Sequence, residues 1–374
     1  MKFIVFEFET LSPAIITLRR TSRGFLSTLN YIPAPTLKGA IVAGLYRMNI
    51  VDKKFLEEEA RNPRIFVSNG YPVGEGKSYP CHPFGYECKA FHAGETEHHK
   101  TLNYAIEAME ALENSKQPSF KTSCSKGHLA VEPLHPNPVI PDGNSLKRAK
   151  VYSCRSISVG INKHKASSEK GMLYEYDAIT VGQRFWSSAA IPDELNIESN
   201  KEFLIGRGIT RGFGRIRIAD VKKLLLGERA SRIRDSVMKK KRVVFYALSN
   251  TLSIRDGKYM PYPESIDLSE VGGRCGIKVS GRLLNKEVYG RTGMLVGGWD
   301  MLRNRARPVF EHAGNRGSII VAEIESNDDA SEAIAALEFI GTVESAFGTP
   351  ITGVNMLTPL RLHPMGGESD GFAS

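Results

Sequence analysis

The segment Gly206-Arg-Gly-Ile-Thr-Arg-Gly-Phe-Gly-Arg215 places four glycines and three arginines in ten residues and runs into the alternating stretch Ile216-Arg217-Ile218. Glycine adopts backbone conformations that other residues avoid, and it lets a ligand approach the main chain. Successive exposed N–H groups in such a loop form an anion-binding concavity, and arginines add bidentate contacts to phosphate. The segment therefore predicts a loop that binds a phosphate backbone. The alternative is a tight hairpin whose arginines face solvent.

The two common nucleotide-binding loops do not fit this segment. A P-loop requires Lys followed by Ser or Thr after its last glycine, but Phe213 and Arg215 occupy that region. The dinucleotide fingerprint requires a following helix, whereas these glycines lead into a β-patterned run. We therefore do not expect mononucleotide or dinucleotide binding.

The composition is that of a basic globular protein. The chain has 374 residues and a formal net charge of +9, which favours a polyanionic partner, nucleic acid before membrane. No stretch approaches the ~18 apolar residues of a membrane span. The strand-like N-terminus carries Glu7 and Glu9 where a signal peptide would be apolar. Five cysteines, an odd number in a long chain, argue against a disulfide framework, so we expect a reducing, cytoplasmic location.

Strand and helix patterns divide the chain into two α+β domains, each a small sheet with helices on one face. We expect an N-terminal domain at residues 1–225 and a C-terminal domain at residues 240–374. Within the first, residues 63–150 form an irregular insertion, interrupted by one helix at about 101–113. Residues 151–185 form a long hairpin, called the finger below.

Further helices are expected at three places. The prolines of Tyr31-Ile-Pro-Ala-Pro-Thr36 give an extended lead-in, and Thr36 then serves as the N-cap of a helix. Lys38 would lie in the first turn, where a cation opposes the helix dipole unless an anion is near, so Lys38 is a candidate phosphate ligand. A helical connector is expected at 219–242, and a helix at about 329–347.

Cysteine and histidine concentrate in the insertion. The eight residues of this kind within 48 positions are Cys81, His82, Cys88, His92, His98, His99, Cys124 and His128. Thiolates and imidazoles are the preferred ligands of zinc, and a tetrahedral site needs four. The turn Cys124-Ser-Lys-Gly-His128 forms one half-site, and Cys88 with His98 or His99 forms the other. No Cys-x-x-Cys pair is present, so a scatter of surface histidines and ordinary cysteines remains the alternative to a closed structural zinc site.

Four blocks of this sequence resemble the RAMP superfamily of CRISPR-associated proteins, and within it the Cas-five-like subunit that caps the 5′ tag of the guide RNA in type III-D effector complexes. Tyr31-Ile-Pro-Ala-Pro-Thr-Leu-Lys-Gly-Ala40 is similar to the family's Y-I-P-G-S-x-L-[RK]-G-A, with Ala34 and Pro35 in place of glycine and serine. The glycine-rich loop resembles G-R-x-x-x-R-G-F-G-R. The other two blocks are the finger, with Ile157-Ser-Val-Gly-Ile-Asn-Lys-His164 and Gly171-Met-Leu-Tyr-Glu-Tyr176, and the C-terminal pair Gly297-Gly-Trp-Asp300 and Gly314-Asn-Arg-Gly-Ser318. The blocks span roughly residues 1–320. The segment Ala346-Phe-Gly-Thr-Pro350 lacks the arginine of a second glycine-rich motif, which puts RNA binding by the second domain in doubt.

The resemblance implies an RNA-binding structural subunit built from two ferredoxin-like, RRM-related domains. Such a subunit holds the 5′ handle of the guide RNA (crRNA), contacts target RNA indirectly, and binds the large and backbone subunits of the complex. The RNA-binding residues so implied are Arg23, Lys38, Lys163, Lys165, Gly206, Arg207, Gly208, Arg211, Gly212, Phe213, Gly214 and Arg215. The candidate metal ligands, taken from the cysteine and histidine pattern, are Cys88, His98, Cys124 and His128. Phe213 either stacks on a base or anchors the loop to the core.

An enzyme of the same superfamily is the main alternative. A metal-independent endoribonuclease that processes the precursor transcript needs a general acid and base, and His164 and His312 are available. Neither lies in a segment typical of a rigid active-site wall, so we expect no catalysis. The repeated backbone subunit, which can carry a target-cleaving aspartate, fits the length and two-domain layout less well.

Overall fold

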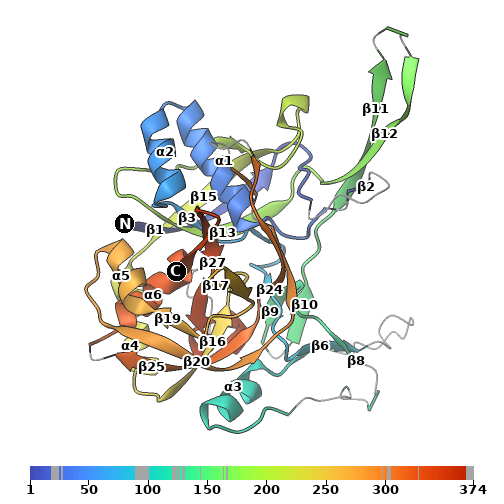
Figure 1. The fold of residues 1–374 in the computed structure, drawn as a ribbon. Coiled ribbons are helices and arrows are strands. Elements are labelled where there is room, and N and C mark those ends of the chain that lie inside the picture. The colour runs from blue at the N-terminus through green and yellow to red at the C-terminus, as the bar shows by residue number, and fades with distance from the viewer. Residues whose placement is uncertain are drawn as a thin grey trace.

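The computed structural model has a mixed α+β fold, as predicted (Figure 1). It describes residues 1–17, 25–26, 28–88, 101–119, 124, 127–128, 131–143, 145–162, 164–165, 167–296, 298–300, 305–326 and 328–367. The α-helices in this part of the chain are α1 (Ala34–Arg47), α2 (Lys53–Arg61), α3 (Ala105–Glu113), α4 (Leu226–Ser236), α5 (Leu268–Cys275) and α6 (Ser331–Ile340). None of them is long and apolar enough to cross a membrane.

The first large sheet has β1 at its centre. Its strands, in the order β14-β15-β1-β13-β3 with β4 also paired to β13, are β14 (Glu202–Leu204), β15 (Arg215–Leu224), β1 (Lys2–Thr10), β13 (Arg184–Ile191), β3 (Phe66–Val67) and β4 (Tyr71–Pro72). Successive side chains of a strand point to opposite faces. Ile4 and Phe6 of β1 pack in one core with Leu37 of α1, while Phe3 packs on the other face, edge-on to Phe339 of α6 at 5.2 Å. Elements from both halves of the chain therefore cover this sheet.

The second large sheet is antiparallel and carries the C-terminal half of the chain. In order, its strands are β19 (Ser265–Asp267), β20 (Gly281–Tyr289), β25 (Ile319–Ser326), β16 (Arg242–Ala247) and β28 (Leu357–Pro359). Helix α6 is apolar almost all round and is buried between the two sheets, in contact with β28, β3 and β13. Four two-stranded hairpins complete this half: β17 (Ser253–Arg255) with β18 (Lys258–Met260), β21 (Thr292–Val296) with β24 (Val309–Gly314), β22 (Trp299–Asp300) with β23 (Arg305–Ala306), and β26 (Thr342–Ala346) with β27 (Thr349–Val354).

The insertion contains α3 and two small three-stranded sheets. One consists of β7 (Leu102–Asn103), β6 (Gly85–Cys88) and β8 (Val131–Pro133), the other of β10 (Ser145–Arg148), β9 (Pro138–Asp142) and β5 (Tyr79–Pro80). The finger is the antiparallel pair β11 (Ser153–Asn162) and β12 (Ser167–Ile179), joined in parallel by β2 (Phe25–Leu26). It projects away from the rest of the molecule (Figure 1).

Three predicted elements were wrong in extent or type. Helix α1 begins at Ala34, with Pro33 as its N-cap, because the first turn of a helix needs no N–H from Pro35. The expected helical connector begins instead as strand, since β15 continues to Leu224 in register with β1, and only α4 beyond it is helical. Helix α6 ends at Ile340, where Gly341 adopts a positive φ of 64°, and the rest of the predicted helix is β26.

Candidate nucleic-acid interface

The glycine-rich loop joins β14 to β15 through a short 3-10 turn, η2 (Ile209–Arg211). All four of its glycines have left-handed φ values between 73° and 89°, a region that costs other residues about 1–2 kcal/mol. Two are also fixed by packing. A Cβ on Gly214 would lie 1.9 Å from the carbonyl oxygen of Ile205, and one on Gly206 would lie 2.4 Å from that of Ile15. These glycines hold the loop against the start of the chain.

Half of the loop's amide groups are used in internal hydrogen bonds. Five of them donate to carbonyl oxygens of the loop or of the neighbouring segment at residues 13–15. They are those of Arg207, Arg211, Gly212, Phe213 and Gly214, at 2.8–3.3 Å. A backbone N–H that already has an acceptor is not available to a phosphate. These five amide groups therefore take no part in anion binding, and the exposed arginines are the loop's candidate anion ligands.

The three arginines of the loop are exposed but differ in their partners. Arg215 donates to Glu202 at 2.9 Å. Among the described residues no carboxylate lies within 4.0 Å of Arg207 or Arg211. The guanidinium of Arg211 lies 5.2 Å from the ring centroid of Tyr176, on the finger strand β12, and 5.8 Å from that of Phe213, within cation–π range. Phe213 is half-buried and supports this arginine, so it is neither a core residue nor a freely exposed ring.

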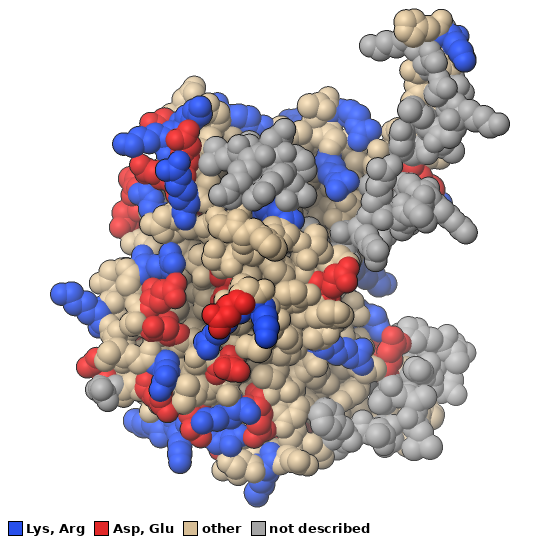
Figure 2. Space-filling view, viewed as in Figure 1, with Lys and Arg blue, Asp and Glu red and all other residues tan. Residues whose placement is uncertain are grey.

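The surface charge at the glycine-rich loop differs from that over the neighbouring helix α2. Figure 2 shows positive and negative side chains mixed over α2, as in its ion pairs of Lys53 with Glu57 and Lys54 with Glu58. Where the yellow-green turn η2 lies in Figure 1, the same view shows positive side chains without adjacent negative ones. The loop is therefore a local cationic surface on a molecule whose charges are otherwise interspersed on this face.

Lys38 is held by a buried carboxylate. Its Nζ lies 2.7 Å from Oε1 of Glu59, and only 13% of the Lys38 side chain is exposed. Glu59 also accepts from the backbone N–H groups of Arg64 and Ile65. Burial lowers the pKa of Lys38, the Glu59 carboxylate opposes that shift, and Arg307 adds to it. Because α1 begins earlier than predicted, Lys38 lies beyond the first turn, and Glu59 supplies the anion that its position needed.

Lys38 also lines a cleft between the two halves of the chain, called the α1–β27 cleft here. The cleft has a volume of about 420 Å³. Its walls are α1 and α2 on one side, Ile209 of the glycine-rich loop, and Arg307 with Pro350 and Thr352 from the second half. The structure thus brings together the Lys38-Gly39 block and the glycine-rich loop, which are far apart in sequence. Arg307 was missed by the sequence analysis, although the basic run Arg303-Asn-Arg-Ala-Arg307 was a signal for it.

The remaining predicted RNA contacts lie elsewhere. Lys165 is exposed at the tip of the finger, as is His164. Arg23 and Lys163 lie outside the described residues. His312 is exposed on β24. The finger therefore presents its tip away from the loop, and Tyr176 near its base meets Arg211 of the loop (Figure 1).

Three of the four predicted metal ligands converge. One ligand atom from each of Cys88, Cys124 and His128 lies within 4.8 Å of the others, and Sγ of Cys88 lies 3.5 Å from Nδ1 of His128. A tight turn holds two of them: the amide of Cys124 donates to the carbonyl of His128 at 3.0 Å, and Gly127 has a φ of 81°. This cluster could hold a metal ion. His98 lies outside the described residues.

Other members of the predicted cluster serve the core. His82 is fully buried, and its Nε2 lies 2.9 Å from Oδ1 of Asn103. Burial lowers the pKa of His82 to about 3, and it raises the pKa of the Cys81 thiol. A neutral imidazole and a protonated thiol in these surroundings are structural.

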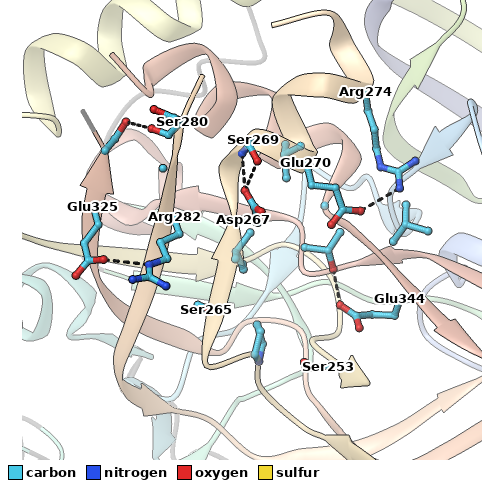
Figure 3. A pocket seen from close by; sticks show the side chains of 18 of the residues that line it. Ser253, Ser265, Asp267, Ser269, Glu270, Arg274, Ser280, Arg282, Glu325 and Glu344 are labelled. Atoms are coloured by element: carbon cyan, nitrogen blue, oxygen red, sulfur yellow. Dashed lines mark hydrogen bonds and ion pairs between the residues drawn. The ribbon is translucent and has the colours of Figure 1, made fainter. Parts of the chain in front are cut away.

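A groove of about 970 Å³ lies beside the second sheet (Figure 3). Two ion pairs lie along it, Arg274 with Glu270 and Arg282 with Glu325, each at 3.0 Å. Asp267 caps α5 by accepting from the N–H of Ser269 at 2.8 Å. The lining holds three arginines and four carboxylates, so its net charge of −1 does not favour RNA.

No protein-family model matches the chain, and no curated protein matches it. Among solved structures, it is similar to a chain of the Type III-B Cmr-beta bound to cognate target RNA and AMPPnP, with a TM-score of 0.45 and 12% identity over 86% of each chain. A second structure of the Type III-B Cmr-beta bound to cognate target RNA gives a TM-score of 0.46 and 11% identity over the same shares. Cmr4 from Pyrococcus furiosus aligns over 60% of this chain and 100% of its own, with 13% identity and a TM-score of 0.25.

Proposed function

We propose that this chain is an RNA-binding structural subunit of a type III CRISPR effector complex, with two ferredoxin-like domains, and that it caps the 5′ handle of the guide RNA as in type III-D complexes. The observation that carries RNA binding is the pair of exposed arginines, Arg207 and Arg211, without carboxylate partners among the described residues. The net charge of +9 supports a polyanionic partner. The capping role rests on the sequence blocks that resemble the family.

A binding and cleavage assay with the purified protein tests this proposal. Single-stranded RNA carrying the repeat sequence that adjoins the guide should bind and remain uncut. Because the chain is proposed to hold the RNA 5′ handle, removing that handle should weaken binding, whereas duplex DNA of the same sequence should bind less well. Specific cleavage that is lost in His164→Ala or His312→Ala would replace the structural role with that of a processing endoribonuclease.

We further propose that Cys88, Cys124 and His128 bind a structural zinc ion that pins the insertion. Two buried thiols and an imidazole are a donor set that zinc prefers. Metal analysis of the purified protein should find zinc in the wild type and a loss of it in Cys124→Ala. Cys154→Ala is the matched control, since Cys154 lies on β11 and outside the cluster. Equal zinc in Cys124→Ala and the wild type, or none in either, would contradict the site.

A further inference from the structure

The α1–β27 cleft has an opening that packing does not explain. Gly39 lies inside α1, where glycine is the least favourable residue apart from proline. A Cβ built on Gly39 meets no atom within 4 Å, whereas one on Gly44 of the same helix would lie 2.2 Å from the ring of Phe203. Gly44 is therefore required by packing, but Gly39 is not. Its missing side chain keeps the wall of the cleft open, as expected where a ligand comes close to the backbone.

The lining of the cleft combines apolar walls with cationic groups. Val42, Leu56 and Pro350 are apolar, and Tyr46 and Ile209 add surfaces that are 42% and 45% exposed. Its charged groups are Lys38, Arg47, Arg307 and the Glu59 carboxylate, so three positive charges and one negative leave a net charge of +2.

Lys38 has donors to spare in this cleft. An ammonium group has three N–H donors, and among the described residues the hydrogen-bonding partner of Lys38 is Glu59. Its remaining donors suit a phosphate or a carbonyl oxygen. Apolar walls beside cationic donors suit a nucleobase that carries a phosphate, and the volume of about 420 Å³ falls in the usual range of ligand sites.

The cleft is continuous with the glycine-rich loop. Ile209 lines the cleft and lies two residues from both Arg207 and Arg211. An RNA strand whose phosphates contact these arginines would pass the mouth of the cleft. We propose that the α1–β27 cleft takes the base of one nucleotide of the bound RNA, turned out of the strand, with its phosphate towards Lys38 and Arg307. This inference rests on the proposed RNA binding.

Filling the cleft tests the inference. Gly39→Leu adds an apolar side chain at a helical position with open space, so α1 should be retained, which circular dichroism would check. RNA affinity should fall about 5- to 140-fold, the contribution of one stacked base. Gly273→Leu is the matched control, because Gly273 is also an exposed glycine in a helix, α5, with nothing within 4 Å of its Cβ. This control should bind RNA like the wild type.

A second measurement locates the base. RNAs carrying 2-aminopurine at successive single positions should show one position whose fluorescence rises on binding, because that base loses its stacked neighbours. The rise should be absent in Gly39→Leu and in Ile209→Asp, which places a negative charge at the mouth of the cleft. Wild-type RNA affinity in both variants, with no position-specific signal, would overturn the inference while leaving RNA binding by the loop intact.

A free nucleotide also carries a base and a phosphate, so it is the alternative ligand of the cleft. If a nucleoside monophosphate binds the wild type, fails to bind Gly39→Leu, and is not displaced by RNA, the cleft is a free-nucleotide site and the RNA inference is wrong. Displacement by RNA would support it. If the wild-type protein binds no RNA in the anisotropy titration at low salt, the proposed function fails together with this inference.

Discussion

The pairing of the loop arginines predicts how RNA affinity depends on salt. Each phosphate that a cation neutralises on single-stranded nucleic acid changes the slope of log K against log salt by about −0.7. Arg207 and Arg211 have no carboxylate partner in the described structure, so both are available for such contacts. Replacing both with alanine should reduce the slope by about 1.4. Over a fourfold rise in salt, the wild type should then lose about sevenfold more affinity than the double variant.

Arg215 should behave differently because Glu202 already neutralises it. Binding of a phosphate by Arg215 requires it to leave this carboxylate. Glu202→Gln should therefore raise RNA affinity and steepen the salt slope by up to about 0.7.

Fluorescence anisotropy with labelled single-stranded RNA at several salt concentrations measures these slopes. Arg282→Ala is the matched control: Arg282 is also exposed, but it pairs with Glu325 at the edge of the distant groove (Figure 3). A slope in the Arg207→Ala/Arg211→Ala variant equal to that of the wild type would refute the assignment of the loop. An equal loss of slope in Arg282→Ala would show that overall charge, rather than the loop, determines binding.

Three further predictions concern stability. Gly214→Ala should lower the free energy of unfolding, measured by urea titration, by more than the ~1–2 kcal/mol that a left-handed conformation costs a non-glycine residue, because its Cβ would also meet the Ile205 carbonyl. Gly212→Ala is the control: its Cβ has open space, so it should lower the free energy of unfolding by only ~1–2 kcal/mol. Burial lowers the pKa of His82 to about 3 and that of His135 to about 4. Below about pH 6.5 the unfolded chain therefore binds protons that the folded chain does not, and stability should fall by about 4 kcal/mol between pH 7 and pH 5; equal stability at both values would contradict this. A zinc chelator should lower the melting temperature of the wild type but not that of Cys124→Ala, and an unchanged wild type would argue against a structural metal.

The local features of the fold were the predictable ones. The turn from Cys124 to His128 and the glycines of the loop are specified within a few residues, because ligand chemistry and backbone conformation are local properties. Strand β15 was mistaken for helix beyond Ala219, since its pairing with β1 joins residues more than 200 positions apart. Likewise, the sequence suggested that Lys38 needed an anion, but only the packing of α2 on α1 identifies Glu59.

Whether a basic side chain already has a carboxylate partner matters more for RNA binding than the net charge of the chain. Several basic side chains on the first sheet already have carboxylate partners, as in the pairs of Arg184 with Glu7 and Arg217 with Glu9. A paired arginine that turns to RNA exchanges one anion for another, so part of the gain from the phosphate contact offsets the lost carboxylate contact. An arginine without a carboxylate partner makes no such exchange. Arg207 and Arg211 are therefore expected to carry the salt-dependent part of RNA binding. The sequence shows three equivalent arginines here, and Glu202 is what makes one of them different.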